Sequence, residues 1–118
     1  MDITNPIVAT HSGGFHADDV TAAAILSLAF PKLNLKNIIR SRNPDRLAKA
    51  DIVFDVGGVY DPETHRYDHH MKVSPRRDAT SLYSSAGLIW RAFGKQAIKN
   101  RAPSLSDAHV DEIWDKID

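Results

Sequence analysis

Cysteine is absent from the sequence of 118 residues, which excludes disulfides and every zinc site that uses thiolate ligands. An excess of charge is also absent, since fifteen basic residues balance fifteen acidic ones. The chain therefore lacks an overall basic field, and any binding of a polyanion must be local. No apolar run approaches the roughly 20 residues of a membrane-spanning helix, and the first residues do not form a signal peptide. We expect a cytoplasmic protein without membrane association.

The length predicts one small domain covering residues 1–118. The last helical pattern reaches residue 118 without a cap or a glycine, which predicts that this domain is truncated at its C-terminus. Dimers are common among small folds with incomplete cores, and the sequence leaves open whether this chain forms a homodimer.

Short apolar runs alternate with helical patterns along the chain. The runs that predict strands are residues 7–10, 37–40 and 51–56. The patterns that predict helices are residues 17–30, 45–50, 81–100 and 107–118. Residues 59–70 predict a hairpin that turns at Asp61-Pro62. Strands without polar alternation are typical of a sheet buried on both sides, so we expect an α/β fold with a mainly parallel sheet and helices on both faces.

A first candidate site lies where the first predicted strand gives way to a buried helix. His11, His16 and Asp18 surround the glycines at positions 13 and 14. In open α/β sheets, sites form at the carboxyl ends of strands, and imidazole with carboxylate suits Mn, Fe, Zn or Co. The alternative is structural: Asp18 and its neighbour Asp19 would stabilise the helix N-terminus.

A second candidate is Asp55, at the end of the apolar run DIVFDV. A carboxylate at the end of a buried strand is costly unless it is paired or binds a cation. The alternative is that Asp55 only receives hydrogen bonds from the turn at Gly57-Gly58.

The third candidate is HRYDHH, residues 65–70, which holds half of the six histidines. If the stretch is extended, alternate side chains point to opposite faces, so its histidines cannot all reach one ion. One histidine would then bind a metal, the other would meet the substrate, and Asp68 would hold an imidazole without touching the ion. The alternative is a solvated loop. The role of His65 stays open between supporting a ligand and packing beside Tyr67.

Several motifs together resemble a known family. Asp68-His69-His70 is the DHH signature, and residues 11–18 match the pattern HxGxFHxD. With RNPDRLAKADIVFDVGGVYDPETHRYDHH and the later SSAGLIWRAFG, the chain resembles the DHH phosphoesterase superfamily. It is most like the branch named after the melanocyte proliferating gene, which contains RNA exonucleases and bacterial metal-dependent hydrolases.

The resemblance implies a site for two ions, Mn²⁺ or Mg²⁺. The metal ligands that it implies are His11, His16, Asp18, Asp55 and His69. Asp55 would bridge both ions, and His70 would face the substrate phosphate. Such a pair of ions can bind a phosphodiester and activate a water molecule. Asp55, His69 and His70 are therefore the implied catalytic residues.

Arg76 and Arg77 follow the DHH motif and are candidates for binding phosphate oxygens, with a solvated basic pair as the alternative. The family completes its site with a further aspartate in a phrase like DAxDNG, which this chain lacks. The expected function is the N-terminal catalytic part of a metal-dependent phosphodiesterase, a 3′–5′ exonuclease of RNA or short oligonucleotides. The alternatives are a hydrolase of small phosphates, such as pyrophosphate or nucleotides, and a fragment that binds metal or nucleotide without catalysis.

Overall fold

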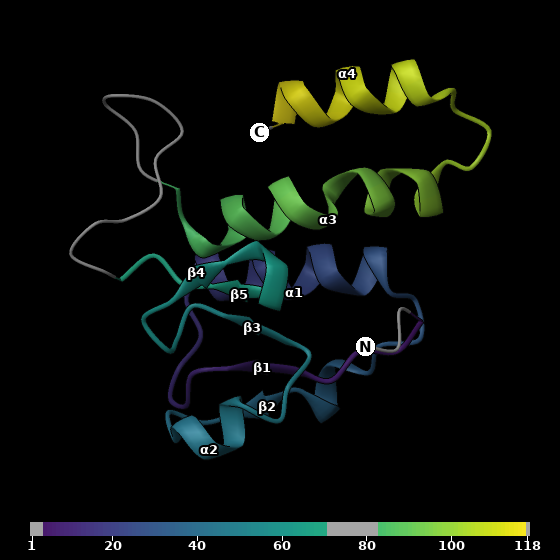
Figure 1. The fold of residues 1–118 in the computed structure, drawn as a ribbon. Coiled ribbons are helices and arrows are strands. Elements are labelled where there is room, and N and C mark those ends of the chain that lie inside the picture. Colours follow the sequence, from purple (N-terminus) through teal and green to yellow (C-terminus); the bar gives the residue numbers. More distant parts are fainter. Residues whose placement is uncertain (1–3, 71–82, 118) are drawn as a thin grey trace.

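The computed structural model describes residues 4–70 and 83–117, and it confirms the expected α/β fold (Figure 1). One sheet contains five strands in the order β2-β1-β3-β5-β4. Their bounds are Val8–Thr10 (β1), Ile39–Arg40 (β2), Ile52–Phe54 (β3), Tyr60–Asp61 (β4) and Arg66–Tyr67 (β5). All neighbouring pairs are parallel except β4 and β5. The predicted hairpin is thus confirmed, with the short 3₁₀ helix Pro62–Thr64 in its turn.

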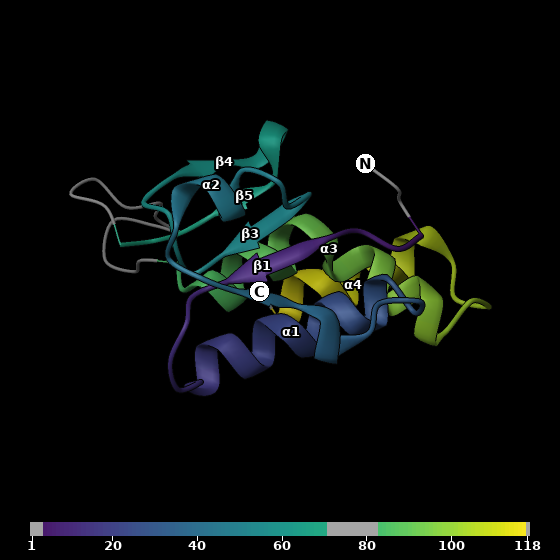
Figure 2. The same ribbon diagram turned by 90° about the horizontal axis from the view of Figure 1, so that it is seen from below.

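Helices cover both faces of the sheet, as expected. Helix α1 (Ala17–Ala29) and helix α3 (Ser85–Arg101) lie on one face, and the short helix α2 (Pro44–Leu47) lies on the other (Figures 1 and 2). Alternate side chains of β3 pack on opposite faces of the sheet. Ile52 and Phe54 belong to the core under α1 and α3, whereas Val53 packs with Leu47 of α2. This explains why the strands read as unbroken apolar runs.

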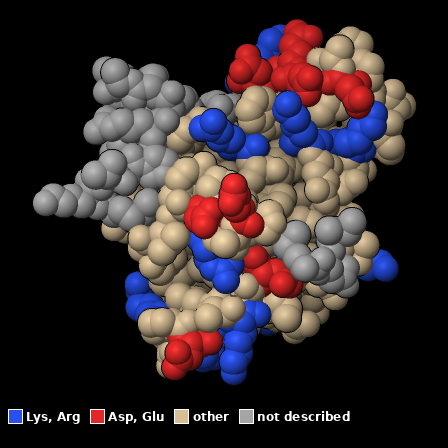
Figure 3. All heavy atoms as spheres, in the orientation of Figure 1, with Lys and Arg blue, Asp and Glu red and all other residues tan. Residues whose placement is uncertain are grey.

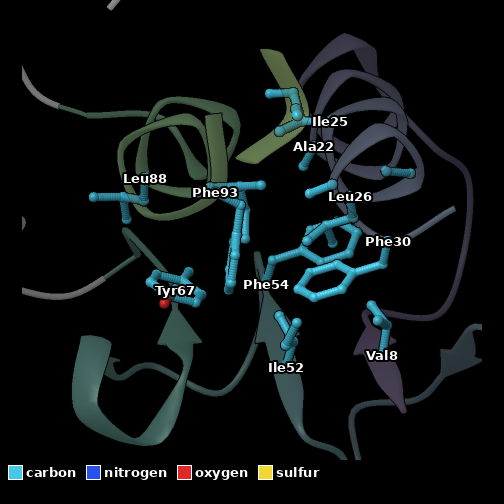
Figure 4. Close-up of a cluster of buried hydrophobic side chains, with 14 of the residues drawn as sticks. Val8, Ala22, Ile25, Leu26, Phe30, Ile52, Phe54, Tyr67, Leu88 and Phe93 are labelled. Carbon is cyan, nitrogen blue, oxygen red and sulfur yellow. The ribbon is translucent and has the colours of Figure 1, made fainter. Parts of the chain in front are cut away.

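The larger core is closed by aromatic rings between the sheet and the helices (Figure 4). Phe30, at the end of α1, packs edge to face on Phe93 of α3, with 5.3 Å between the ring centroids. Tyr67 of β5 packs on the same Phe93 ring at 5.8 Å. These contacts join α1, α3 and β5, so the helices hold the strand ends in fixed positions.

Helix α4 (Asp107–Ile117) packs along α3 on the side away from the sheet (Figure 1). Two tryptophans join the helices, because Trp90 Nε1 donates to the Trp114 carbonyl and Trp114 Nε1 donates to the Trp90 carbonyl. Acidic side chains over α4 face basic side chains over α3 (Figure 3), and Lys95 pairs with Asp111 at 3.1 Å. No helix among residues 4–70 and 83–117 has the length and hydropathy to cross a membrane.

Three predicted boundaries were wrong. The helix expected from residue 81 begins at Ser85, because Ser84 is its N-cap and accepts a hydrogen bond from Gly87 N; residues 81 and 82 lie outside the described part. The helix expected over 45–50 is the single turn Pro44–Leu47. The strand expected over 37–40 is reduced to β2, since residues 35–37 form a 3₁₀ helix capped by Asn34.

Candidate metal and phosphate site

The site lies at the carboxyl ends of the parallel strands, the edge of the sheet from which α1 and α3 start (Figure 1). A cavity of about 560 Å³ opens there. Its walls come from the loop after β1, from the strand ends and from the segment after β5. The lining residues are His11, Ser12, Gly13, Gly14, His16, Arg42, Asp55, Gly58, Asp68 and His70. Four chain segments, which follow β1, β2, β3 and β5, therefore meet in one cavity, as expected for open α/β sheets.

His11 is buried at the end of β1 and is held by both ring nitrogens. Nδ1 donates to the Ser12 carbonyl over 2.9 Å, and Nε2 lies 2.8 Å from Asp19 Oδ2. Nε2 also lies 3.5 Å from Asp55 Oδ2. Burial lowers the pKa of His11, but the Ser12 carbonyl and the carboxylates of Asp19 and Asp55 outweigh it, so the pKa is raised. Only a proton or another cation between Nε2 and these oxygens can make this arrangement favourable.

Asp55 follows β3 in a left-handed backbone conformation, with φ of 58°. Its backbone N–H donates to the Tyr67 carbonyl, which fixes the turn against β5. The carboxylate is buried, and burial together with the nearby carboxylates of Asp19 and Asp18 raises its pKa to about 6. A strained conformation at a non-glycine residue is costly and is found mainly where a side chain must be aimed.

His69 faces two carboxylates from different segments. Its Nε2 lies 3.0 Å from Asp55 Oδ1 and 3.5 Å from Asp18 Oδ2. Asp18 also accepts hydrogen bonds from the backbone N–H groups of Ser85 and Ala86, at 3.2 and 2.6 Å. The carboxylate of Asp18 therefore lies against the first turn of α3, where it accepts from backbone N–H groups that the helix itself leaves unpaired.

Asp68 is fully buried and organises the DHH segment. Its Oδ2 accepts from Gly58 N at 2.7 Å, and its Oδ1 accepts from His69 N at 2.8 Å and from His70 N at 3.3 Å. The same Oδ1 lies 2.7 Å from His70 Nδ1. Burial raises the pKa of Asp68, but the hydrogen bonds from Gly58, His70 and His69 outweigh it and lower the pKa below its usual value. Both oxygens are engaged, so Asp68 is suited to orienting His70 rather than to binding an ion directly.

Two groups of potential ligands share Asp55. One consists of His11, Asp19 and Asp55, and the other consists of Asp55, Asp68, His69 and His70. Asp55 Oδ2 faces the first group and Oδ1 faces the second. Asp19 Oδ1 is buried and has no hydrogen-bond partner within residues 4–70 and 83–117, a costly arrangement that a cation would relieve. Imidazole and carboxylate donors of this kind fit Mn²⁺ and related ions. The residues present therefore fit a pair of ions.

The structure brings most of the predicted residues to this place. His11, Asp18, Asp55, His69 and His70 converge, and Asp68 supports the last of them through its hydrogen bond. His16 also lines the cavity, where it is the N-cap residue of α1, but its side chain belongs to neither group of potential ligands among the described residues.

His65 packs in the hairpin. Its Nδ1 lies 3.0 Å from the Tyr67 hydroxyl, and its ring lies beside that of Phe93. Of the two roles left open for His65, packing is therefore the one that its contacts match. The predicted phosphate ligands Arg76 and Arg77 lie outside the described residues.

For two residues of the site, the contacts were not predicted from the sequence. Asp19 was assigned only to the helix terminus, yet it is completely buried beside His11. The phase of α1 carried the signal, because residues three, four and seven positions further along form its buried face. Ser85 is also completely buried, and its hydroxyl contacts Asp55 Oδ1 at 3.2 Å and the Tyr67 carbonyl at 3.1 Å. No local pattern predicts that contact.

Comparison with known proteins agrees with the motifs. Residues 7–118 match the family model MYG1_exonuc, described as Uncharacterised protein family (UPF0160). The chain is 40% identical over 121 residues to the MYG1 exonucleases of Mus musculus and Homo sapiens, covering 95% of this chain and 32% of each relative. It is 46% identical over 82 residues to a MYG1 protein of Chlamydia trachomatis, covering 70% of this chain and 26% of that protein. The chain thus spans about a third of the length of the mammalian relatives. No solved structure matches. The chain belongs to the MYG1 exonuclease family.

Proposed function

We propose that this chain forms the metal-binding part of a phosphodiesterase that removes nucleotides from the 3′ end of RNA or short oligonucleotides. The observation that carries the proposal is the position of Asp55, whose two oxygens serve two adjacent groups of imidazole and carboxylate ligands. The exonuclease names of the mammalian relatives support a nucleic-acid substrate.

The first ion would be held by His11, Asp19 and Asp55, with His16 close by on the cavity wall. The hydrogen bond from His11 Nδ1 to the Ser12 carbonyl supports this assignment, because it leaves Nε2 as the coordinating atom. The second ion would be held by Asp18, Asp55 and His69. One carboxylate oxygen of Asp18 and one of Asp55 lie within 3.5 Å of His69 Nε2. Mn²⁺ or Mg²⁺ at these positions would polarise a phosphate and lower the pKa of a bound water molecule.

The remaining groups position the substrate. His70 is held through Nδ1 by Asp68, and its side chain is 61% exposed on the cavity wall. That hydrogen bond directs Nε2 away from Asp68, and in the imidazolium form of His70 this Nε2 would also donate, so it could bind a phosphate oxygen. Arg76 and Arg77 remain predicted phosphate ligands, because they follow directly on this segment.

Two alternatives follow from the same site. The cavity, about 560 Å³, also suits a small phosphate such as pyrophosphate or a mononucleotide. A chain that spans about a third of its mammalian relatives can, in addition, bind metal without turnover. Two aspartates of the last helix, Asp107 and Asp111, pair with Lys99 and Lys95 of α3.

The experiment compares cleavage of a 3′-labelled RNA oligonucleotide with hydrolysis of pyrophosphate, both in Mn²⁺. Asp55→Asn and His69→Ala are expected to abolish cleavage of the oligonucleotide. His109→Ala, which removes an exposed histidine of α4, is the matched control and is expected to leave cleavage unchanged. Calorimetric titration with Mn²⁺ accompanies each assay.

The outcomes separate the candidates. Cleavage that survives both substitutions would refute the ligand assignment. Faster hydrolysis of pyrophosphate than of RNA would favour the small-phosphate alternative. Mn²⁺ binding that His69→Ala weakens, without cleavage of either substrate, would favour a fragment that binds metal without catalysis.

A further inference from the structure

Arg42 lines the cavity and lies outside both groups of potential metal ligands. It follows β2, which is the neighbour of β1 in the sheet, so it arrives beside the loop that carries His11 and His16. Among the described residues that line this cavity, Arg42 is the one lysine or arginine. Its position is therefore set by the sheet order rather than by proximity to the DHH motif.

The backbone around Arg42 is fixed on both sides. Ser41 N donates to the Thr10 carbonyl at 2.9 Å, which ties the end of β2 to the end of β1. Asn43 N donates to Ser41 Oγ at 3.0 Å, and Asn43 caps α2 through Asp45 N. An arginine held in this way loses less conformational freedom on binding a ligand than one on a mobile loop.

The guanidinium group has donors that the described residues do not use. Nη2 donates to the Ser12 carbonyl over 3.3 Å, which draws the side chain across the cavity wall. A guanidinium group carries five N–H donors in a planar fork, and no salt bridge to Arg42 is found among residues 4–70 and 83–117. The other donors are therefore available for an acceptor in the cavity.

The wall beside Arg42 leaves room for such an acceptor. Gly13, in a left-handed conformation with φ of 98°, and Gly14 both line the cavity, and a Cβ built on either would meet no heavy atom within 4 Å. Asp55 follows β3, and Asp68 and His70 follow β5, and all three line the same cavity. Because β1 and β3 separate β2 from β5 in the sheet, Arg42 and the DHH segment reach the cavity from strands that are not neighbours.

We propose that Arg42 binds a phosphate group of the substrate from the β2 side of the cavity. This inference rests on the proposed function and deepens it, since it assigns a substrate-binding residue that no sequence motif indicated. Arginine is suited to the task because its fork donates two parallel hydrogen bonds to phosphate oxygens. Lysine at the same position would keep the charge and lose the fork.

Arg40 offers a matched control two residues away. It is exposed, and its guanidinium carbon lies 4.3 Å from the centroid of the Phe15 ring rather than in the cavity. Arg40→Gln and Arg42→Gln remove the same charge from nearly the same place. Long-range electrostatics therefore change alike in the two variants, and only a direct contact with the substrate distinguishes them.

The test measures kcat and KM for a labelled RNA oligonucleotide in Mn²⁺, together with its Kd in Ca²⁺, for wild type, Arg42→Gln, Arg42→Lys and Arg40→Gln. Loss of a charged hydrogen-bonded contact is expected to raise KM and Kd by about tenfold to a hundredfold in Arg42→Gln. Arg42→Lys is expected to recover part of this loss, and Arg40→Gln to stay within about twofold of wild type. Mn²⁺ affinity and melting temperature are expected to stay unchanged in all variants, which excludes misfolding as the cause.

The outcomes separate this inference from the proposed function. If wild type cleaves the oligonucleotide and Arg42→Gln behaves like Arg40→Gln, the role of Arg42 is refuted while the proposed function stands. If wild type binds the oligonucleotide without cleaving it, the proposed function fails, and the Kd values alone support or overturn the role of Arg42. If wild type neither binds nor cleaves it, both are refuted.

Discussion

Replacing Asp55 by asparagine is expected to stabilise the metal-free chain while it destroys the metal site. Asp55 is 9% exposed, and burial with the neighbouring Asp19 and Asp18 carboxylates raises its pKa from 3.8 to about 6. For an acid with a raised pKa, the stability that protonation supplies is fully present below 3.8 and is lost as the pH rises through about 6. At higher pH the Asp55 carboxylate is charged in both states, but it is buried in the folded chain and solvated in the unfolded chain. The charge therefore lowers the free energy of unfolding.

The magnitude follows from the shift. A rise in the pKa of Asp55 from 3.8 to about 6 corresponds to roughly 3 kcal/mol of free energy of unfolding. Removing the charge can raise the stability by that amount at most. Asparagine keeps one oxygen to accept the hydrogen bonds of Ser85 Oγ and His69 Nε2, but it accepts them more weakly. We expect Asp55→Asn to raise the free energy of unfolding by about 1–2 kcal/mol at about pH 8 in a chelator.

Asp68→Asn is the control with the opposite sign. Its carboxylate is also buried, but hydrogen bonds from Gly58, His69 and His70 hold its pKa below the usual value. This stabilisation is present above the usual pKa and is lost as the pH falls through the lowered one. Neutralising Asp68 should therefore cost about 1–3 kcal/mol under the same conditions.

The assay is urea denaturation of wild type, Asp55→Asn and Asp68→Asn, first with chelator and then with Mn²⁺. Manganese should stabilise wild type and leave Asp55→Asn unaffected, so the order of stability of these two reverses when the metal is added. If both variants are destabilised to a similar degree in chelator, the reasoning about like charges around Asp55 is wrong.

Four further predictions concern the site and its support. His69→Ala should weaken Mn²⁺ binding at least about tenfold by calorimetry, because it removes a predicted ligand of the second ion; unchanged binding would place the ion elsewhere. Because the raised pKa of Asp55 keeps its proton below about pH 6, Mn²⁺ affinity should fall roughly tenfold per pH unit below that value, and a flat profile in calorimetry would contradict this. Ser85→Ala should cost about 1–3 kcal/mol in urea denaturation, since the buried Asp55 and Tyr67 oxygens lose a donor. Gly94→Ala should destabilise the docking of α4, because a Cβ there would lie 2.9 Å from the Trp114 side chain of α4 and 2.6 Å from that of Trp90. It should leave Mn²⁺ affinity unchanged, and a normal melting temperature would refute the clash.

Much of the fold was predictable because the signals are local. The strands β1 and β3 are unbroken apolar runs, and α1 is apolar on nearly every side until the chain reaches Pro31. The element boundaries were less predictable. Helix α3 begins at Ser85 and not at an earlier residue: Ser84 caps it, and its first turn lies against the carboxylate of Asp18, which is distant in sequence.

The sequence by itself determined which chemical groups follow the strand ends. His11 follows β1, Asp55 follows β3 and Asp68-His69-His70 follows β5. Carboxylate and imidazole groups must therefore lie together at one edge of a parallel sheet. The same local information indicated that Asp68 would hold an imidazole, but not which one.

Only the tertiary structure decided how those groups divide their contacts. It pairs Asp68 with His70, turns Asp19 toward His11, and places Asp55 between the two groups of ligands. It also brings Arg42 to the cavity, because β2 lies next to β1 in the sheet. These contacts depend on strand order and helix packing, which are set by the burial of the whole core and not by any one stretch of the chain.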